Sequence, residues 1–293
     1  MGSGGVNMNV SKMIICDLKN GIIHNKRYYL VPVLIFFECM YSDNLLRILS
    51  FGQSFGKPTI FDLLILVFRG CDPISKLPKD NSIPDLPYFW IAIFIFSVFC
   101  GFDYMHDDLT QFGTQIITRC KKRRTWWNSK CIWCIVSSFY FYLLTILTII
   151  LYGALHDYEF VFENNHAITN AFAGSSLTHK LADNNIISTF NKICLVIAPY
   201  LVICTLNMIQ MILCLYLKPI FSYIIPSIII MAATYTDSSI IFTRFGMLLY
   251  TQNYFVNGYS TFIGIVICLL IIIMSIIWGE KHFKVANILP DKE

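Results

Sequence analysis

Long apolar runs, separated by shorter polar segments, limit the possible folds of this chain more than any other feature. A helix needs about 20 apolar residues to cross the hydrocarbon core of a bilayer. Six runs reach or approach that length, and they cover residues 29–50, 86–102, 131–154, 193–217, 219–235 and 260–278. The pattern predicts an all-α, polytopic membrane protein with six transmembrane helices.

The composition agrees with a membrane protein. Of the 293 residues, 56% are hydrophobic and only 14% are charged, whereas soluble proteins carry about 25% charged residues. We predict one transmembrane domain over residues 11–293. Residues 1–10, which begin Met-Gly-Ser-Gly-Gly, are interpreted as a tag or a disordered start. The eleven cysteines follow no disulfide framework, so we expect free thiols that behave as small apolar side chains.

One basic segment suggests an orientation in the membrane. Residues 117–130 hold six of the 22 Lys and Arg residues. With the N-terminus in the cytoplasm, the inner segments carry 14 basic residues and the outer segments carry 8. Because cytoplasmic segments are enriched in Lys and Arg, we expect both termini to be cytoplasmic. Five residues at the end of the segment are predicted to anchor it at the membrane interface: Arg123, Arg124, Trp126, Trp127 and Lys130.

Several connecting segments have an apolar stripe at helical spacing. Residues 11–23 place Ile14, Ile15, Leu18 and Ile22 on one face, which predicts an N-terminal interfacial helix. Residues 59–69 are too few to cross the membrane and are predicted to form a short helix on the outer rim. Residues 239–255, broken at Gly246, predict a pair of re-entrant outer helices before the last span. Residues 105–120 carry a stripe of Met105, Leu109, Phe112, Ile116 and Cys120.

Three polar side chains within the apolar runs are candidates for a substrate path. Glu38 is an acid in the first run, and Asn207 and Gln210 lie in the fourth. Ionisable groups inside a membrane often mark a transport pathway. The alternative is structural: a neutral carboxyl at Glu38, and hydrogen bonds between helices at Asn207 and Gln210.

The chain shows little that indicates enzyme chemistry. Cys131 and Cys134 form a CxxC pair, but a membrane oxidoreductase needs a second pair to relay electrons, and no other close pair exists. Gly56-Lys57 does not complete a phosphate-binding loop, because Pro58 stands where that loop needs Ser or Thr. We therefore expect no catalytic residues, and no metal, cofactor or nucleic acid bound by this chain.

The order of these elements resembles the permease subunits of type-two (type V) ABC exporters. The similar features are six spans, an N-terminal interfacial helix, the amphipathic segment 105–120, and an outer helical pair before the last span. The most specific local part is residues 102–130, which has an acidic start, a Gly113-Thr114 step, an apolar stretch and a basic run. The resemblance implies that 105–120 is a coupling helix that docks on a separate ATPase. The residues implied in coupling are Asp107, Asp108, Leu109, Phe112, Gly113, Ile116 and Ile117.

The resemblance also implies a function and partners. It predicts the membrane subunit of an ATP-driven transporter in a bacterial plasma membrane, exporting a peptide, an antimicrobial or a lipid-like substrate. Two ATPase subunits would bind ATP and Mg, and a second permease chain, the same or homologous, would complete the path through the lipid bilayer. Two alternatives remain: a secondary transporter that uses Glu38, and an intramembrane enzyme, either a thiol oxidoreductase or a protease.

Overall fold

The computed structural model shows a bundle of helices. It describes residues 10–49, 56–71, 86–102, 104, 108, 123–165, 187–236, 238, 241–255 and 258–285. The elements in these ranges are α1 (Val10–Leu18), η1 (Lys19–Ile23), η2 (Lys26–Leu30), α2 (Val31–Leu49), α3 (Ile60–Val67), α4 (Tyr88–Cys100), α7 (Arg123–Leu155), α9 (Thr189–Leu213), α10 (Pro219–Tyr235), η4 (Phe242–Gly246), η5 (Leu248–Tyr250) and α11 (Thr261–Val285). Within the described ranges two isolated bridges occur and no strand, so the all-α prediction is confirmed for them.

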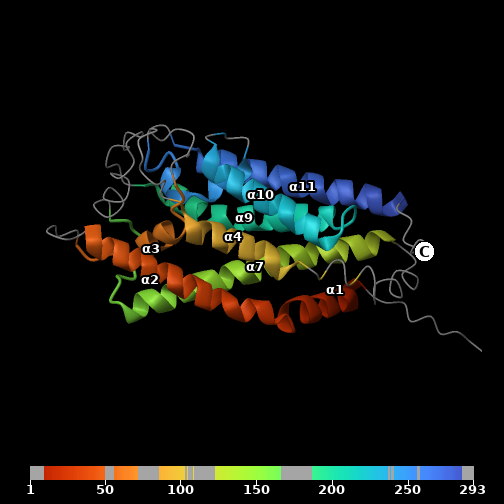
Figure 1. The fold of residues 1–293 in the computed structure, drawn as a ribbon, viewed down its shortest axis with the longest axis horizontal. Helices are drawn as coiled ribbons and strands as arrows, with labels where there is room; N and C mark the ends of the chain where they lie inside the picture. The colour runs from red at the N-terminus through yellow and green to blue at the C-terminus, as the bar shows by residue number, and fades with distance from the viewer. Residues whose placement is uncertain are drawn as a thin grey trace, which may run out of the picture.

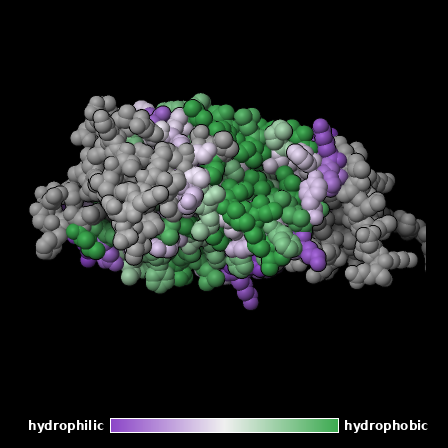
Figure 2. Space-filling view, turned by 45° about the horizontal axis from the view of Figure 1, so that its top comes forward, coloured by the Kyte–Doolittle hydropathy of each residue, from purple (hydrophilic) through white to green (hydrophobic). Residues whose placement is uncertain are grey.

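Four helical stretches are long and apolar enough to cross a membrane. They are Lys26–Ile48, Arg124–Leu155, Thr189–Leu213 and Thr261–His282. Two further apolar helices, Tyr88–Cys100 and Pro219–Tyr235, are shorter. Large apolar side chains are exposed along these helices, and Figure 2 shows hydrophobic surface across the middle of the molecule with hydrophilic patches toward each end. The chain is therefore a helical membrane protein.

The helices lie roughly along the long axis of the molecule (Figure 1). α1 and α2 follow one another along one side of α7, and α9 packs against α7, α10 and α11. We call one end of the bundle the α1 end, where α1, the start of α7 and the end of α11 meet. We call the other the α3 end, where α3, η4 and η5 lie.

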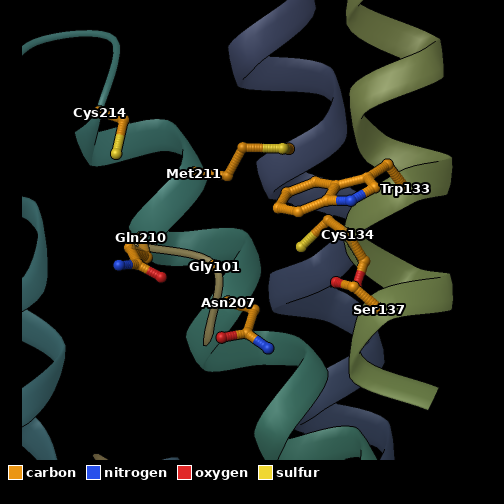
Figure 3. A pocket seen from close by; sticks show the side chains of 8 residues that line it. All are labelled: Gly101, Trp133, Cys134, Ser137, Asn207, Gln210, Met211 and Cys214. Atoms are coloured by element: carbon orange, nitrogen blue, oxygen red, sulfur yellow. The ribbon is translucent and has the colours of Figure 1, made fainter. Parts of the chain in front are cut away.

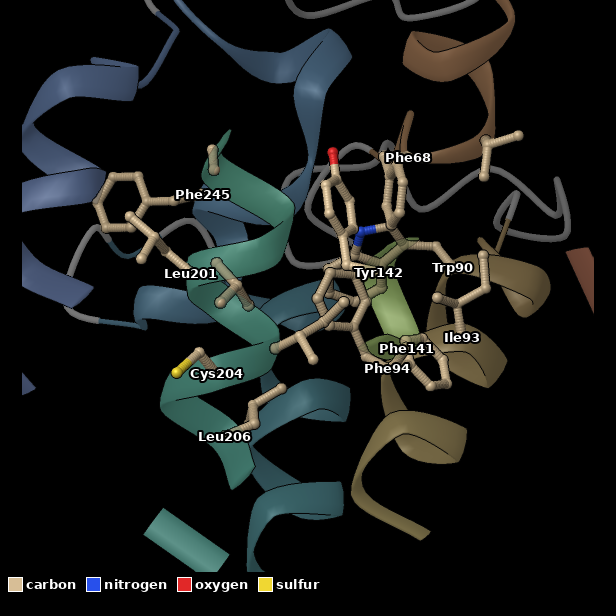
Figure 4. Packing of buried hydrophobic residues seen from close by; sticks show 14 of the residues in the cluster. Phe68, Trp90, Ile93, Phe94, Phe141, Tyr142, Leu201, Cys204, Leu206 and Phe245 are labelled. Atoms are coloured by element: carbon tan, nitrogen blue, oxygen red, sulfur yellow. The ribbon is translucent and has the colours of Figure 1, made fainter. Parts of the chain in front are cut away.

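Buried aromatic side chains fill the centre of the bundle near the α3 end. The ring of Phe94 lies 4.7 Å from that of Trp90 and 6.1 Å from that of Phe68, centroid to centroid. Phe68 also faces Tyr142 of α7 at 6.3 Å, and Figure 4 shows these rings meeting between α4, α7 and α9. Because interiors are close-packed, this contact fixes α3 and α4 against the long helices.

α7 is longer than the sequence pattern indicated. It begins at Arg123 and has 33 residues, which makes it about 50 Å long at 1.5 Å per residue. A hydrocarbon core is only about 30 Å thick. The apolar run began at residue 131, so the additional turns belong to the basic segment. They lie at the α1 end, where α1 packs on them.

Two predicted elements differ from expectation in their detail. α1 buries Met13 and Asp17 in the protein, whereas Ile15 of the predicted apolar stripe is 63% exposed, as a side chain that faces lipid would be. The Asp17 side chain points into the bundle because it forms an ion pair there with Lys130 of α7. Residues 239–255 were expected to form a helical pair, but the described part forms only the two short 3-10 helices η4 and η5. They are buried: Trp90 Nε1 donates to Gly246 O at 3.1 Å, and Leu248 N donates to Phe68 O at 2.8 Å.

Candidate functional site

A buried ion cluster joins three parts of the chain at the α1 end. Lys130 Nζ lies 2.6 Å from Asp17 Oδ1 and 2.8 Å from Asp108 Oδ2. The side chains of Lys130, Asp17 and Asp108 are 1%, 7% and 13% exposed. Asp17 belongs to α1, Lys130 to α7, and Asp108 to the segment between α4 and α7. One ammonium group therefore holds carboxylates from two other segments.

Neutral donors complete the coordination of the two carboxylates. Ser129 Oγ donates to Asp17 Oδ2 at 2.5 Å, and the Tyr104 hydroxyl donates to Asp17 Oδ1 at 2.9 Å. Trp126 Nε1 donates to Asp108 Oδ2 at 3.0 Å. Burial raises the pKa of the Tyr104 phenol well above its usual range, so this hydroxyl remains a donor. Two acids face one base here, and these three donors stabilise the excess negative charge.

Aromatic rings enclose the ammonium group from two sides. Lys130 Nζ lies 4.7 Å from the ring centroid of Tyr104 and 5.4 Å from that of Trp126. Both distances suit a cation–π contact. We name the set of Asp17, Tyr104, Asp108, Trp126, Ser129 and Lys130 the Lys130 cluster. Because these side chains exclude water from the ion pairs, removing either the lysine or one of the carboxylates should strongly destabilise the fold.

The residues predicted as interface anchors have two different environments. Trp126, Trp127 and Lys130 are buried in the protein, so their side chains do not face lipid as an anchor would. Trp127 Nε1 donates to Ile276 O at 3.0 Å, and its ring lies directly against Gly279 of α11. Arg124 is exposed and pairs with Glu280 at 3.2 Å. Nothing is described of the Arg123 side chain, and the depth of this segment in a membrane stays a prediction.

The predicted coupling residues are only partly described. Asp108 is placed in the Lys130 cluster. The others lie outside the described residues: Asp107, Leu109, Phe112, Gly113, Ile116 and Ile117. Tyr104, just before this segment, and Asp108, within it, are nevertheless bonded to α1 or α7 side chains. The start of segment 105–120 is thus attached to the bundle by buried charges.

Two of the three predicted substrate-path residues share one cavity. Asn207 and Gln210 of α9 line a cavity of about 10 Å³ between α7, α9 and the end of α4 (Figure 3). Three of its lining residues carry a buried atom without a hydrogen-bond partner: Asn207 Oδ1, Gln210 Nε2 and Trp133 Nε1, the last on the side of its ring that faces Gly21. An unsatisfied buried polar atom costs about 1–3 kcal/mol. We name this space the Asn207 cavity.

Glu38 lies elsewhere. It is buried in α2, Oε1 accepts a hydrogen bond from Ser42 Oγ at 3.1 Å, and Oε2 has no partner. Asn25 marks the level of the Asn207 cavity, because its side chain donates to Cys100 O beside Gly101 at 2.7 Å. Glu38 is thirteen residues further along the chain, or about 20 Å along the helix axis. The three predicted path residues therefore do not form one site.

The Trp133 ring lies between the Lys130 cluster and the Asn207 cavity. Its ring centroid is 4.3 Å from that of Tyr104, and its outer edge faces Gly101 at the cavity wall. On the other side, Gly21 of η1 lies so close to the ring that any side chain at Gly21 would collide with it. A displacement of Tyr104 would therefore move the wall of the cavity.

The cysteine pair lies inside the bundle. Cys131 and Cys134 are both free and buried. Within the described residues no group of three or more His, Cys, Asp or Glu side chains could hold a metal ion. The sequence did not indicate the Lys130 cluster, since Asp17 is 113 positions away from Lys130 along the chain.

The fold and site define a class, a helical membrane protein with a buried ion cluster at one end of its bundle. A family model described as "Protein of unknown function (DUF2705)" matches residues 73–287. The chain belongs to the DUF2705 family. The matched residues include Asp108, Lys130, Asn207 and Gln210, whereas Asp17 precedes them. Comparison with curated proteins and with solved structures gives no match.

Proposed function

We propose that this chain is the membrane-spanning permease subunit of an ATP-driven exporter. The observation that carries the proposal is the Lys130 cluster, because it attaches the start of segment 105–120 to α1 and α7 through buried charges. A force applied to that segment would reach the long helices directly. Segment 105–120 is the one whose apolar stripe suits docking on a partner protein.

In this proposal α4 and α10 also cross the membrane, which gives six spans. α4 has 13 residues and α10 has 17, so α4 is only about 20 Å long. The two short helices lie side by side, with the rings of Phe99 and Tyr223 at 6.2 Å. A bilayer thins locally beside short helices at modest cost. The distribution of Lys and Arg supports an α1 end and both termini in the cytoplasm of a bacterium.

The partners follow from the same mechanism. Two ATPase subunits, which bind ATP and Mg, would dock at the α1 end, and a second permease chain, the same or homologous, would complete the path. The cargo class, a peptide, an antimicrobial or a lipid-like molecule, rests on the resemblance to type-two (type V) exporters alone.

Co-purification from the native membrane tests the assembly. The tagged chain should bring down an ATPase in a fixed ratio, and the complex should hydrolyse ATP. Leu109→Asp and Phe112→Asp add a charge to the apolar stripe and should abolish both association and ATP hydrolysis. Gln115→Asp, which adds the same charge off the stripe, is the matched control and should keep both. An intact complex in the two stripe variants would contradict the proposal.

A second candidate function is favoured by one observation. Glu38 Oε2 is buried in a membrane helix without a partner, and such a carboxyl can carry a proton across a bilayer. A secondary transporter driven by a proton gradient would use it. Transport by vesicles that hold the chain alone, driven by a pH gradient without ATP and lost in Glu38→Gln, would support this candidate over the exporter.

A further inference from the structure

A groove on α11, at the α1 end of the bundle, is apolar at one end and basic at the other. Its volume is about 390 Å³, and it is lined by Met274, Ile277, Trp278, Lys281 and His282. These residues recur at helical spacing, so they lie on one face of α11. The groove extends about 12 Å along the helix axis and ends at His282, where the candidate span also ends. We name it the Trp278 groove.

The apolar end of the groove faces lipid. Met274, Ile277 and Trp278 are 59%, 46% and 61% exposed, and α11 lies at the edge of the bundle (Figure 1). Leu270 and Ile273, which come just before on the same helix, are exposed as well. In a membrane protein this surface lies against acyl chains, which are as apolar as leucine. The Trp278 groove is therefore continuous with the lipid-facing surface of the span.

A second element of the fold holds the polar end of the groove. Trp278 Nε1 donates to the hydroxyl oxygen of Tyr216 at 2.9 Å. The Tyr216 ring lies 4.2 Å from the His282 ring, centroid to centroid. Tyr216 belongs to the connection between α9 and α10, so this connection fixes two side chains of the groove. Because the Tyr216 hydroxyl accepts the bond from Trp278, it keeps its own proton for another acceptor.

The charge at the polar end is positive. Lys281 lines the groove, and Lys218, two residues after Tyr216, is exposed. No acid lines the groove among the described residues. Glu280, the acid beside Lys281 in the sequence, pairs with Arg124 at 3.2 Å. Apolar surface and positive charge thus follow one another along α11, in the order in which a phospholipid carries its acyl chains and its phosphate.

We propose that the Trp278 groove binds an anionic phospholipid, with an acyl chain on Met274 and Ile277 and the phosphate at Lys281. Basic pockets beside membrane helices bind anionic head groups, and tryptophan side chains favour the depth of the head groups. A peptide in the apolar part would bury backbone amides without partners. A free phosphate ion would leave Met274 and Ile277 uncovered. The site needs neither an ATPase nor a cargo, so it is independent of the proposed exporter.

Trp278 is a natural reporter for this site. The chain has five tryptophans, and the other four are at most 3% exposed: Trp90, Trp126, Trp127 and Trp133. Bromine on an acyl chain quenches tryptophan fluorescence on contact. Brominated lipid should therefore quench Trp278 far more than the four buried rings, and the variant Trp278→Phe measures what remains from them.

Competition between lipids measures the affinity. The full chain is placed in vesicles of phosphatidylcholine whose acyl chains are brominated near the glycerol. Unbrominated phosphatidylglycerol, or unbrominated phosphatidylcholine, is then added in increasing proportion, and fluorescence returns as it displaces the brominated lipid from Trp278. We expect phosphatidylglycerol to bind about five-fold more tightly than phosphatidylcholine, which is the effect of about one basic residue near an anionic lipid. Sodium chloride should reduce this ratio by screening.

Two variants separate this groove from general surface charge. Lys281→Gln removes the charge that lines the groove and should bring the ratio close to one. Lys12→Gln is the matched control, because Lys12 is an exposed lysine of α1, and α1 lies on the opposite side of the bundle from α11 (Figure 1). This control should keep the wild-type ratio. Both lysines are exposed, so both variants should fold.

Four results would overturn the assignment. They are equal affinity for the two lipids, an unchanged ratio in Lys281→Gln, a loss in Lys12→Gln as large as that in Lys281→Gln, and fluorescence that brominated phosphatidylcholine does not quench. The last would mean that a protein surface, for example a second copy of this chain, covers the groove. Sodium phosphate should lower the ratio only as much as sodium chloride of equal ionic strength. A larger effect of phosphate would assign the groove to the free ion and contradict the lipid site.

Discussion

The two ends of the bundle hold their buried acids in opposite ways. At the α1 end, Asp17 and Asp108 share the ammonium group of Lys130. At the α3 end, Asp62 accepts hydrogen bonds from Thr59 N, Thr59 Oγ1 and Asn165 N, and it belongs to no ion pair among the described residues. The stability of the α1 end therefore depends on the ammonium group of Lys130. The stability of the α3 end depends on whether the Asp62 carboxyl is protonated.

Burial raises the pKa of the Asp62 carboxyl to about 6. Its hydrogen bonds with Thr59 form a capping box at the start of α3 and limit the rise. Thr59 Oγ1 also lies 2.6 Å from Glu163 O, and its one proton cannot serve both acceptors. A protonated Asp62 removes this conflict, because it can donate to Thr59 while Thr59 donates to Glu163 O. The α3 end is thus the pH-sensitive end.

The largest expected effect is the loss of the shared base. Lys130→Met leaves Asp17 and Asp108 buried without a cation, and removing one partner of a buried ion pair costs about 3–5 kcal/mol. Thermal unfolding of the purified chain in detergent measures the change. The triple variant Asp17→Asn, Asp108→Asn, Lys130→Met removes the charges together and should recover much of the loss. If Lys130→Met alone unfolds at the wild-type temperature, the α1 end does not depend on its ion pairs, and the proposed difference between the two ends is wrong.

A second variant tests the contact between α7 and α11 at the same end. The Trp127 ring occupies the space where a side chain at Gly279 would lie, so Gly279→Ala should destabilise the chain by about 1–3 kcal/mol through overpacking. The same unfolding measurement applies. Trp127→Leu should be destabilising alone but should relieve the collision in the double variant, so the two effects should not add. Additive effects would show that the two residues are not in contact.

The third prediction concerns pH at the α3 end. A folded pKa of about 6, above the usual 3.8, means that the folded state holds this proton more tightly than the unfolded state. The contribution of Asp62 is fully present below pH about 4 and is lost as pH rises through about 6, on the order of 3 kcal/mol. Unfolding temperatures from pH about 4 to about 7 should therefore fall less in Asp62→Asn than in the wild type. Parallel curves would contradict the assignment.

The smallest effect is expected at an exposed ion pair of the α1 end. Arg124 lies 3.2 Å from Glu280, but its side chain is 66% exposed. Exposed pairs contribute about 0–1 kcal/mol and are screened by salt. Arg124→Ala should shift the unfolding temperature only slightly, and less still in high salt. A loss as large as that of Lys130→Met would mean that burial does not explain the difference between these two basic residues.

The sequence predicted the helices better than their contacts. Periodicity and run length located the apolar helices, because burial in lipid or protein imposes the pattern on each helix separately. They also identified Asn207 and Gln210 as polar residues within an apolar run, and both line one cavity. Glu38 is also a polar residue within an apolar run, but it lies about 20 Å away along the helix axis. Composition does not show which faces of different helices meet, so it could not separate Glu38 from the other two.

Lys130 shows what a sequence pattern leaves out. A lysine beside two tryptophans in a basic segment is typical of a membrane interface, and the interpretation as an anchor followed from that. The structure instead buries Lys130, because acids from two other segments converge on it. Neither Asp17 nor Asp108 has a spacing to Lys130 that a single helix could explain. Only the arrangement of α1 beside the first turns of α7 brings them together.

The Lys130 cluster also constrains the order in which the chain can assemble during synthesis. Asp17 and Asp108 leave the ribosome before Lys130, so both carboxylates must stay hydrated until the first turns of α7 have been made. Chains that end before residue 130 would therefore carry both acids without their shared basic partner. One lysine thus marks the point in translation at which the N-terminal half of the protein can close.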